Sequence, residues 1–506
     1  MRIPVLRKST PMRRVPLLSG SRVVVVPVDD EDVIIRPPPP PARIVDTGAA
    51  VRDALRFPLS GPSLESIAVR GGRATIVVEP PALPVPGAQR DPRREALAAT
   101  MRALELCGTR NERQTILVAG GLGQRLGQRE LERLLPPAEA RAFRGSVLVH
   151  DVADDGLIPI SDSARIHPAL VETDLVVVVS AAETVLHGGP SALIACCDAA
   201  TVRAATAGSS LLEVAGSESW IRGLEVETAL AQRTALIGVS LVLDLPRLTG
   251  ALSGYPHEVL AADRVAHSPL RGVFSRLPAF VRRDILATRD HRLAATAAFA
   301  GRPSIAHAEA LVRGVELRGA RIDEPVDALL VGAPWIGPHI PREPANPITT
   351  AAVVLGLALR LHRGEPPIRR GGTVILCDPL TRGFAPGTQA PYAAMFNALR
   401  VALDTAALAA SEAGAAGDAK ALSAYRAGKA CHPLLPYADW AGCAPVLSRV
   451  GRVIVAGSRD AIAARALGFV PSHSISSALE MAHGVAEGKA RVGILLAPPY
   501  APLLVG

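Results

Sequence analysis

Short segments in which nearly every residue is apolar recur along this chain, and helical segments separate them. The clearest is DLVVVVSA at residues 174–181, which offers almost no polar face to solvent. Such a strand must be covered on both sides, as in a parallel sheet flanked by helices. Similar runs are ATIVVE, QTILVAG, SVLVHD, TALIGVSLVLDL, VDALLVGAP, GGTVILCDP, GRVIVAGS and ARVGILLAP. The pattern predicts an α/β protein with Rossmann-like, mostly parallel sheets.

Helices are expected between these strands. RREALAATMRALELCG is amphipathic and ends in glycine, and GQRELERLL forms a second helical segment. NPITTAAVVLGLALRLHRG is a third, with Asn346 placed to cap the helix and Pro347 at its first position. The alternation of strand and helix continues into both halves of the chain.

The chain has 506 residues, which is too long for one hydrophobic core. Residues 1–45 are expected to be an appendage, in which RVVVVPV forms a strand and RPPPPPAR a stiff polyproline linker. We expect one α/β domain at residues 46–275 and a second at residues 276–506. The chain can cross between domains, so the boundary between them is approximate.

Composition disfavours several partners. The net charge is +8, but the arginines are scattered among acidic residues and aromatics make up only 3%. A nucleic-acid surface needs clustered cations and stacking rings, so we expect no nucleic-acid partner. The longest apolar runs fall short of the ~20 residues that span a bilayer, and the N-terminus lacks an apolar signal segment. We expect a cytoplasmic protein without membrane contact; its oligomeric state stays open.

The six cysteines contain no C-x-x-C pair, which favours reduced thiols over a zinc site. His432 stands beside Cys431 in CHPLLPYADW, where structural packing is the favoured interpretation over metal binding. No G-x-S-x-G motif is present, so a hydrolase of that type is disfavoured.

A glycine-rich loop in ILVAGGLGQRLGQREL, with glycines at 120, 121, 123 and 127, follows a predicted strand. A strand, a glycine turn and a helix can direct backbone N–H groups at a phosphate. The loop lacks the lysine of a P-loop, and its glycine spacing does not match G-x-G-x-x-G. A tight turn also needs glycine whatever it binds. The sequence therefore favours a structural or differently used turn over a dinucleotide site.

The order of several segments resembles the lactate racemase family. These are DALRFPLSGPSL, ATIVVEPPALPVP, the glycine loop, VLVHDVADDGL and ETDLVVVVSA. The second half is similar to a long variant of that family through ANPITTAAVVLGLALRLHRGEPPIRRGGTVILCDP, YRAGKACHPLLPYADW and VGRVIVAGSRD. The resemblance extends from about residue 46 to the end and rests on the ordered set rather than on one motif.

The resemblance implies two α/β domains with a cleft between them and a nickel-pincer nucleotide as cofactor. In the family, a lysine tethers this pyridinium and a histidine binds its nickel. Two histidines act as bases on opposite faces of a small-molecule 2-hydroxy acid. Each takes the hydroxyl proton while the ring takes hydride, and return to the other face inverts the carbon. Histidine suits proton transfer near neutral pH, and imidazole suits nickel.

Transferred by position, the resemblance assigns the catalytic His-Asp pair to His150 and Asp151. The other interpretation of His150 is a loop histidine satisfied by neighbouring carboxylates. The second catalytic histidine falls on Gly123. His187 is the candidate nickel ligand, with an ordinary loop histidine as the alternative. The candidate cofactor-binding residues are Glu79, Gly121, Gly123, Gln124 and Arg125.

Lysine is absent between Lys8 and Lys420, so the family's usual tether position is not filled. Arginine cannot replace a lysine nucleophile. Two functional hypotheses remain open. The first is a racemase or epimerase of a 2-hydroxy acid that uses His150. The second is a degenerate relative that has lost the chemistry and acts as a binding or regulatory protein, with or without the cofactor.

Overall fold

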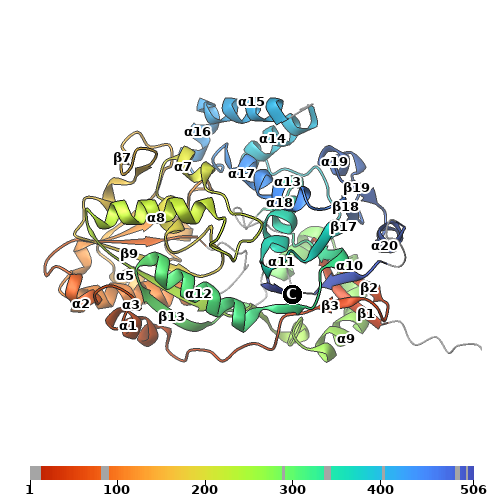
Figure 1. The fold of residues 1–506 in the computed structure, drawn as a ribbon, viewed down its shortest axis with the longest axis horizontal. Helices are drawn as coiled ribbons and strands as arrows, with labels where there is room; N and C mark the ends of the chain where they lie inside the picture. The colour runs from red at the N-terminus through yellow and green to blue at the C-terminus, as the bar shows by residue number, and fades with distance from the viewer. Residues whose placement is uncertain are drawn as a thin grey trace, which may run out of the picture.

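The computed structural model describes residues 13–80, 91–287, 291–335, 343–401, 405–484, 490–496 and 500–506. Two six-stranded sheets lie side by side in this part of the chain, each flanked by helices (Figure 1). Every pairing inside them is parallel except that of the edge strand β13 (Ala295–Gly301). The predicted α/β class with mostly parallel sheets is confirmed.

The first sheet explains why its strands are apolar at every position. Its strands, from one edge to the other, are β13, β10 (Ala235–Leu243), β9 (Leu175–Ala181), β4 (Ala74–Val78), β5 (Gln114–Val118) and β6 (Ser146–Val149). In β4, Ile76 packs toward α1 (Thr47–Arg56) and α3 (Pro92–Leu106). The next residue, Val77, packs toward α6 (Ser191–Ile194) and α8 (Glu218–Ala231). Side chains alternate between faces, so two covered faces require apolar residues throughout.

The chain order of these strands locates a ligand site. Numbered along the chain, they lie in the order 3-2-1-4-5-6, as in dinucleotide-binding domains. The order reverses between β4 and β9. In open α/β sheets, ligands bind outside the carboxyl ends of the strands at such a switch point. Residues that follow β4 and β9 therefore stand where a ligand is expected.

The second sheet has the strands β19 (Val470–Ser472), β18 (Arg452–Ala456), β17 (Ile368–Cys377), β15 (Val326–Gly332), β20 (Val492–Leu495) and β3 (Val33–Ile35). On one face, Leu329 packs toward α13 (Pro347–Ala351) and α17 (Leu435–Gly442). On the other face, Leu330 packs toward the hairpin of β1 (Arg13–Ser19) and β2 (Arg22–Val28). RVVVVPV is thus a strand, as predicted.

Strand pairing differs from the division drawn from the sequence. β3 lies in the segment expected to be an appendage, yet it pairs with β20 inside the second sheet. β13 lies beyond residue 275, yet it completes the first sheet beside β10. The physical reason is that Ile35 and Ala300 are buried in the sheet that each strand joins. The domain boundaries themselves stay a prediction.

Two helices are shorter than the sequence predicts. Asn346 caps α13 by accepting from the backbone N–H groups of Ile348 and Thr349, as expected. The helix then widens into a π-helical segment, η4 (Ala352–Leu357), and ends in the 3₁₀ turn η5 (Ala358–Arg360). After it the chain forms the strand β16 (His362–Gly364). GQRELERLL supplies only the single turn α4 (Gln128–Leu131).

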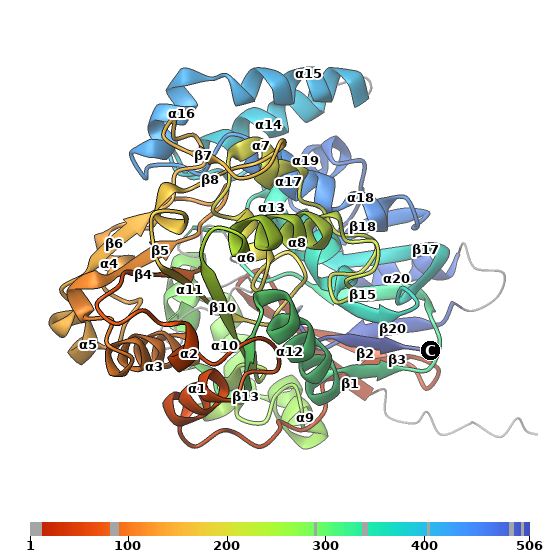
Figure 2. The ribbon, with the colours of Figure 1, turned by 60° about the vertical axis from the view of Figure 1, so that its left-hand side comes forward.

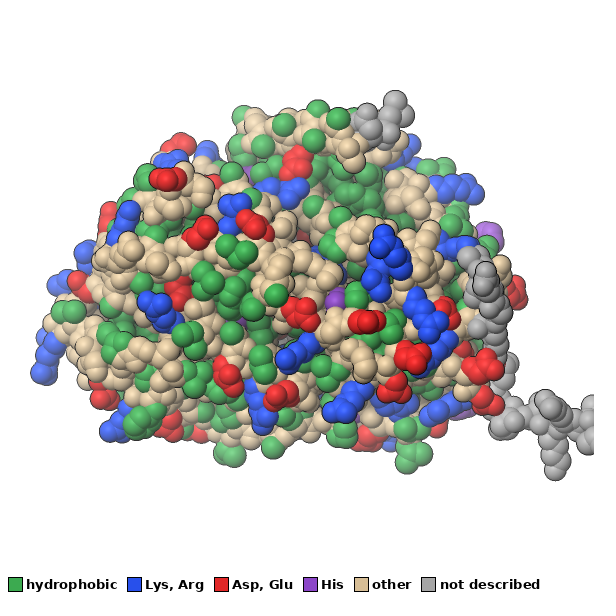
Figure 3. Space-filling view, in the orientation of Figure 1, with side chains coloured by type: hydrophobic (Ala, Val, Ile, Leu, Met, Phe, Trp, Pro, Cys, Tyr) green, Lys and Arg blue, Asp and Glu red, His purple; other side chains and the backbone are tan. Residues whose placement is uncertain are grey.

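The helices α14 (Ala390–Val401), α15 (Thr405–Ala416) and α16 (Ala419–Arg426) lie together at one end of the molecule, the top of Figures 1 and 2. Arg203 at the end of α7 (Ala199–Ala204) forms an ion pair with Glu412 of α15. This group of helices therefore contacts the region around the first sheet as well as the second. Positive and negative side chains are interspersed over the face in Figure 3. None of the described helices is long and apolar enough to cross a bilayer.

Candidate functional site

The residues singled out in the sequence all follow strands of the first sheet at its carboxyl edge. Glu79 follows β4, the glycine loop (residues 120–127) follows β5, and His150 and Asp151 follow β6. His187 lies in the turn after β9. The carboxyl ends of parallel strands share one edge of a sheet, so the fold gathers these residues on one side of the molecule. They form two groups there.

The first group joins the glycine loop to the His-Asp pair. A guanidinium N–H of Arg125 donates to the carbonyl of Val149 at 3.2 Å. Another guanidinium nitrogen of Arg125 lies 3.9 Å from the Asp151 carboxylate. Asp151 also faces the guanidinium of Arg426 at 3.6 Å. The Asp151 carboxylate is thus neutralised by two arginines, one of them from α16.

His150 lies inside the protein, with only 1% of its surface exposed. Its Nε2 donates to the carbonyl oxygen of Cys197 at 2.8 Å. Its ring packs edge-to-face with that of His167, with the two ring centroids 5.7 Å apart. The Nδ1 is buried, and no described residue forms a hydrogen bond with it. Burial lowers the pKa of His150 to about 4. Because this pKa lies well below 7, His150 is a neutral imidazole at pH 7, and its partner is a backbone carbonyl rather than a carboxylate.

The glycine loop is held against the docking segment, residues 425–432, which begins near the end of α16. Gln124 donates to the carbonyl of Gly428 at 2.8 Å, and Arg125 donates to that of Arg426 at 2.7 Å. The Tyr425 hydroxyl donates to the carbonyl of Gly121 at 3.3 Å. The backbone N–H of His432 donates to the carbonyl of Leu122 at 3.0 Å. The polar groups of the loop are therefore engaged with the second half of the chain.

The order of the strands shows that the glycine loop is not in the position of a dinucleotide-binding loop. In the 3-2-1-4-5-6 order, a dinucleotide loop follows the first strand, which is β4 here. The glycine loop instead follows β5, the second strand. Gly121 has a φ of +50°, which a residue with a side chain rarely adopts. The structure favours the interpretation as a structural turn, used to join the two halves of the molecule.

The second group, the switch-point group, lies where the strand order reverses and consists of Glu79, Glu183, His187 and Gly188. The backbone N–H of Gly188 donates to Oε2 of Glu79 at 2.5 Å. Burial raises the pKa of Glu79 to about 8, and the nearby Glu183 carboxylate adds to the rise. Glu79 therefore keeps its proton near neutral pH.

Glu183 lies beside an arginine. Arg93 lies 3.3 Å from the Glu183 carboxylate and 2.9 Å from that of Asp91. The Coulomb attraction of Arg93 is the main effect that holds the pKa of Asp91 below its usual value, in opposition to the burial of that carboxyl. The switch-point group thus places a neutral carboxyl next to a charged arginine–carboxylate pair.

His187 is held within its own turn. Its Nδ1 lies 3.0 Å from the Thr184 hydroxyl, and the Thr184 carbonyl accepts from Nε2 of His307 at 3.0 Å. No three histidine, cysteine, aspartate or glutamate side chains of the described residues are arranged to hold a metal ion. The only lysines in the described ranges are Lys420 and Lys429, both in the second half of the chain.

Sequence reasoning missed the residues that connect the two groups. Cys197 binds His150 through its carbonyl, while the pKa of the Cys196 thiol is raised by burial, by Cys197 and by Glu79. Arg93 and Glu183 were also missed. Glu183 stands two residues beyond a strand end, a signal that the sequence carries. No local pattern reveals that Cys196 and Cys197 lie between Glu79 and His150.

No protein-family model and no curated protein sequence matches this chain. Among solved structures, the lactate racemase apoprotein from Thermoanaerobacterium thermosaccharolyticum aligns with a TM-score of 0.60 at 14% identity. The alignment covers 97% of this chain and 100% of that chain. A protein from Thermotoga maritima aligns with a TM-score of 0.46 at 13% identity, over 92% of this chain and 100% of that one. The similarity to the lactate racemase apoprotein is a similarity of fold, and it extends over nearly the whole of this chain.

Proposed function

We propose that this chain, which has a lactate racemase-like fold, binds a small 2-hydroxy acid at the switch point of its first sheet and does not invert it. The observation that carries the proposal is the docked glycine loop. Gly123 has no side chain to transfer a proton, and its neighbours Gln124 and Arg125 hold the docking segment. Inversion by two bases needs one on each face of the carbon, and the resemblance supplies a histidine for only one of them, His150.

The nickel-pincer nucleotide does not fit the described residues. His187 is the candidate ligand, but its turn supplies no metal-binding group with other His, Cys, Asp or Glu side chains. No described lysine belongs to the first sheet or its helices, where the family's tether is expected. Lys429 lies in the docking segment beside Gly428, whose carbonyl is occupied by Gln124. The function proposed here accordingly needs no nickel.

The switch-point group suits a carboxylate ligand. A protonated Glu79 can donate a hydrogen bond to an anion, which an ionised carboxylate cannot do. Its pKa of about 8 gives this donor at physiological pH. The ligand would then lose affinity as pH rises through 8, because Glu79 becomes an anion and repels it.

A racemase is the second candidate, and one observation favours it. The bond from Nε2 of His150 to the Cys197 carbonyl fixes the proton on Nε2, so Nδ1 carries a lone pair. That Nδ1 has no hydrogen-bond partner among the described residues. An imidazole oriented in this way can act as a base once a substrate reaches it.

One set of measurements separates the two. The protein is purified from cells that make the pincer cofactor, and nickel content and intact mass are determined. Chiral chromatography then follows a panel of single-enantiomer 2-hydroxy acids, with added cofactor, for the wild type and His150→Ala. We expect an unmodified mass, no bound nickel and no inversion. Inversion that His150→Ala abolishes would establish the racemase instead.

Binding is tested separately by calorimetry with the same acids at pH 6.5 and pH 9. We expect saturable binding that weakens at pH 9 in the wild type but not in Glu79→Gln, whose amide stays a neutral donor. An identical pH dependence in both proteins would contradict the role of Glu79. Failure of every acid to bind would contradict the proposed function as a whole.

A further inference from the structure

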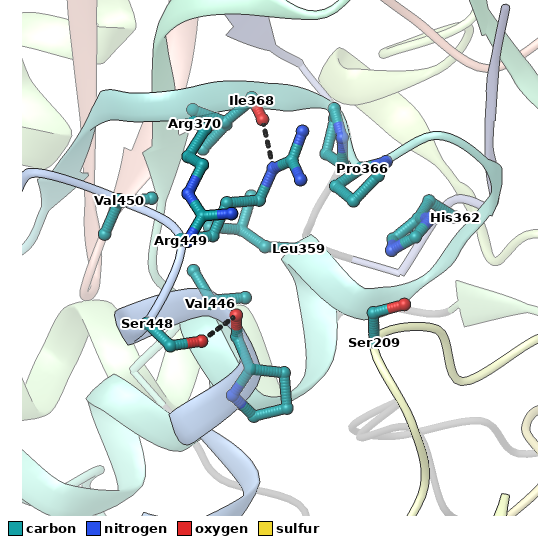
Figure 4. Close-up of a pocket in the computed structure, with 12 residues that line it drawn as sticks. Ser209, Leu359, His362, Pro366, Ile368, Arg370, Val446, Ser448, Arg449 and Val450 are labelled. Carbon is teal, nitrogen blue, oxygen red and sulfur yellow. Dashed lines mark hydrogen bonds between the residues drawn. The ribbon is translucent and has the colours of Figure 1, made fainter. Parts of the chain in front are cut away.

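A cavity of about 450 Å³ lies at the opposite edge of the second sheet from its carboxyl ends. Ile368, the first residue of β17, and Val450, which precedes β18, both line it. His362 of β16 and Ser209 complete the wall shown in Figure 4. A cavity of this size accommodates a small molecule. It is separate from the residues assigned above to the first sheet.

Two arginines, Arg370 and Arg449, give the cavity its charge. The Nε of Arg449 donates to the carbonyl of Ile368 at 2.7 Å, which fixes the direction of its guanidinium in the cavity wall (Figure 4). Neither arginine forms an ion pair with an acidic side chain of the described residues, and no aspartate or glutamate lines the cavity. Two guanidinium groups without a balancing acid favour an anion in the space beside them.

The neighbouring residue, Arg369, does have acidic partners. Arg369 precedes Arg370 in β17, and its guanidinium lies beside two acidic residues at and just before the start of β15. There it lies 2.9 Å from the carboxylate of Asp327 and 3.4 Å from that of Glu324. Arg369 is therefore paired with acidic side chains, whereas Arg370 lines the cavity.

Neutral polar groups line the same space. His362 is 2% exposed, and its Nδ1 is buried without a hydrogen-bond partner among the described residues. Burial lowers the pKa of His362, so its ring is neutral at pH 7. The hydroxyl of Ser448 donates to the carbonyl of Pro445 at 3.1 Å, and its oxygen can still accept a hydrogen bond. These groups add hydrogen bonds without adding charge.

We propose that this cavity is a binding site for a small oxyanion, the phosphate or carboxylate group of a metabolite. Guanidinium groups match both groups geometrically through paired N–H donors. Arg370 and Arg449 would bind the oxyanion, and Ser448 and Ser209 would contact the rest of the ligand. This site is independent of the function proposed for the switch-point group.

The cavity lies where the two halves of the chain meet. Ser209 belongs to a segment whose next residues pair with the second half: the N–H of Leu211 donates to the carbonyl of Arg360 at 2.7 Å. The carbonyl of Leu211 in turn accepts from the N–H of Val185 at 2.8 Å, in the turn that holds His187. An anion between Ser209 and the two arginines would therefore stabilise the junction. Bound ligand should raise the melting temperature, because it binds only the folded state.

The test titrates the full-length protein with inorganic phosphate and with malonate at constant ionic strength, with sodium chloride as the reference. Calorimetry gives the affinity and thermal denaturation the shift in melting temperature. We expect saturable binding of at least one anion by the wild type. Arg370→Gln should weaken it roughly tenfold or more, since a charge-assisted hydrogen bond is lost. Arg363→Gln removes an equal charge from an exposed position of β16 outside the cavity lining, and this variant should bind like the wild type.

Each outcome of the titration either supports the proposal or contradicts it. Binding of phosphate alone identifies a phosphate group, and binding of malonate alone identifies a carboxylate. No saturable binding of either anion overturns the proposal, as does an equal loss in Arg370→Gln and Arg363→Gln. Arg449→Gln is the second variant if Arg370→Gln does not fold, with circular dichroism as the check of folding.

Discussion

The imidazole of His150 donates from Nε2 to the carbonyl oxygen of Cys197 at 2.8 Å. A carbonyl only accepts, so this contact places a proton on Nε2 and thereby fixes the tautomer of the neutral ring. A charged ring would have to exist without water in the interior, and burial accordingly lowers the pKa of His150 to about 4. The burial of this ring makes the stability of the protein depend on pH.

The first prediction concerns acid sensitivity. The unfolded pKa of histidine is about 6.5, above the folded value, so the unfolded state binds the proton first as pH falls. The contribution of His150 is present above pH 6.5 and lost as pH falls toward 4. In urea unfolding, His150→Gln should reduce the loss of stability between pH 7.5 and 4.5 by about 2.5 kcal/mol. Exposed His473 provides the control, and His473→Gln should match the wild type. An unchanged pH slope in His150→Gln would refute the prediction.

The second prediction concerns Glu79, where the sign is reversed. Its folded pKa of about 8 exceeds the unfolded value of about 4.3, so the unfolded state loses its proton first as pH rises. The wild type should therefore lose stability between pH 5 and pH 9. Glu79→Gln keeps an acceptor for the Gly188 N–H and should remove up to about 4 kcal/mol of that loss. Exposed Glu65→Gln is the matched control. Parallel pH profiles for Glu79→Gln and the wild type would show that Glu79 is ionised in the fold.

The third prediction tests the docking of the glycine loop. Tyr425→Phe removes the hydroxyl that donates to Gly121 and accepts from the N–H of Val152. Buried backbone groups lose their partner, so the free energy of unfolding should fall by about 1–2 kcal/mol. Amide exchange at residues 120–125 should become faster. Tyr437→Phe breaks a hydroxyl contact with Ser411 inside the second half and should leave that exchange unchanged. Equal protection of the loop in both variants would argue against the docking role.

The fourth prediction concerns the turn that carries the switch-point group. Gly188 and Gly216 both have a positive φ, of +84° and +73°. A Cβ on Gly188 would lie 2.4 Å from Cε1 of His307, whereas nothing lies within 4 Å of one on Gly216. Both alanine variants incur about 1 kcal/mol for the backbone, and Gly188→Ala should lose a further 1–3 kcal/mol from crowding. Denaturant unfolding compares the two, and equal losses would be inconsistent with this packing.

Much of the fold follows from local sequence. A strand such as β9 is apolar at every position because both of its faces are covered, and that pattern is complete within seven residues. The cap at Asn346 is likewise local, because its side chain accepts hydrogen bonds from the N–H groups two and three residues further along the chain. The placement of His150 and Glu79 beyond strand ends follows from the same patterns.

The candidate site could be predicted only in part. Glycines mark the loop at residues 120–127, but whether it cradles a phosphate depends on which strand precedes it in the sheet order. That order results from pairings between distant strands, such as β4 with β9. Periodicity within one segment carries no information on such partners.

The sequence by itself determined the class of the fold, the strands, and the side chains that stand at their ends, because burial and capping act over a few residues. The tertiary structure decided what those side chains do. It brought the Cys197 carbonyl to His150, the Gly188 N–H to Glu79, and the docking segment to the glycine loop. Each of these contacts joins positions far apart along the chain, and the burial that accompanies them sets the proton states of His150 and Glu79.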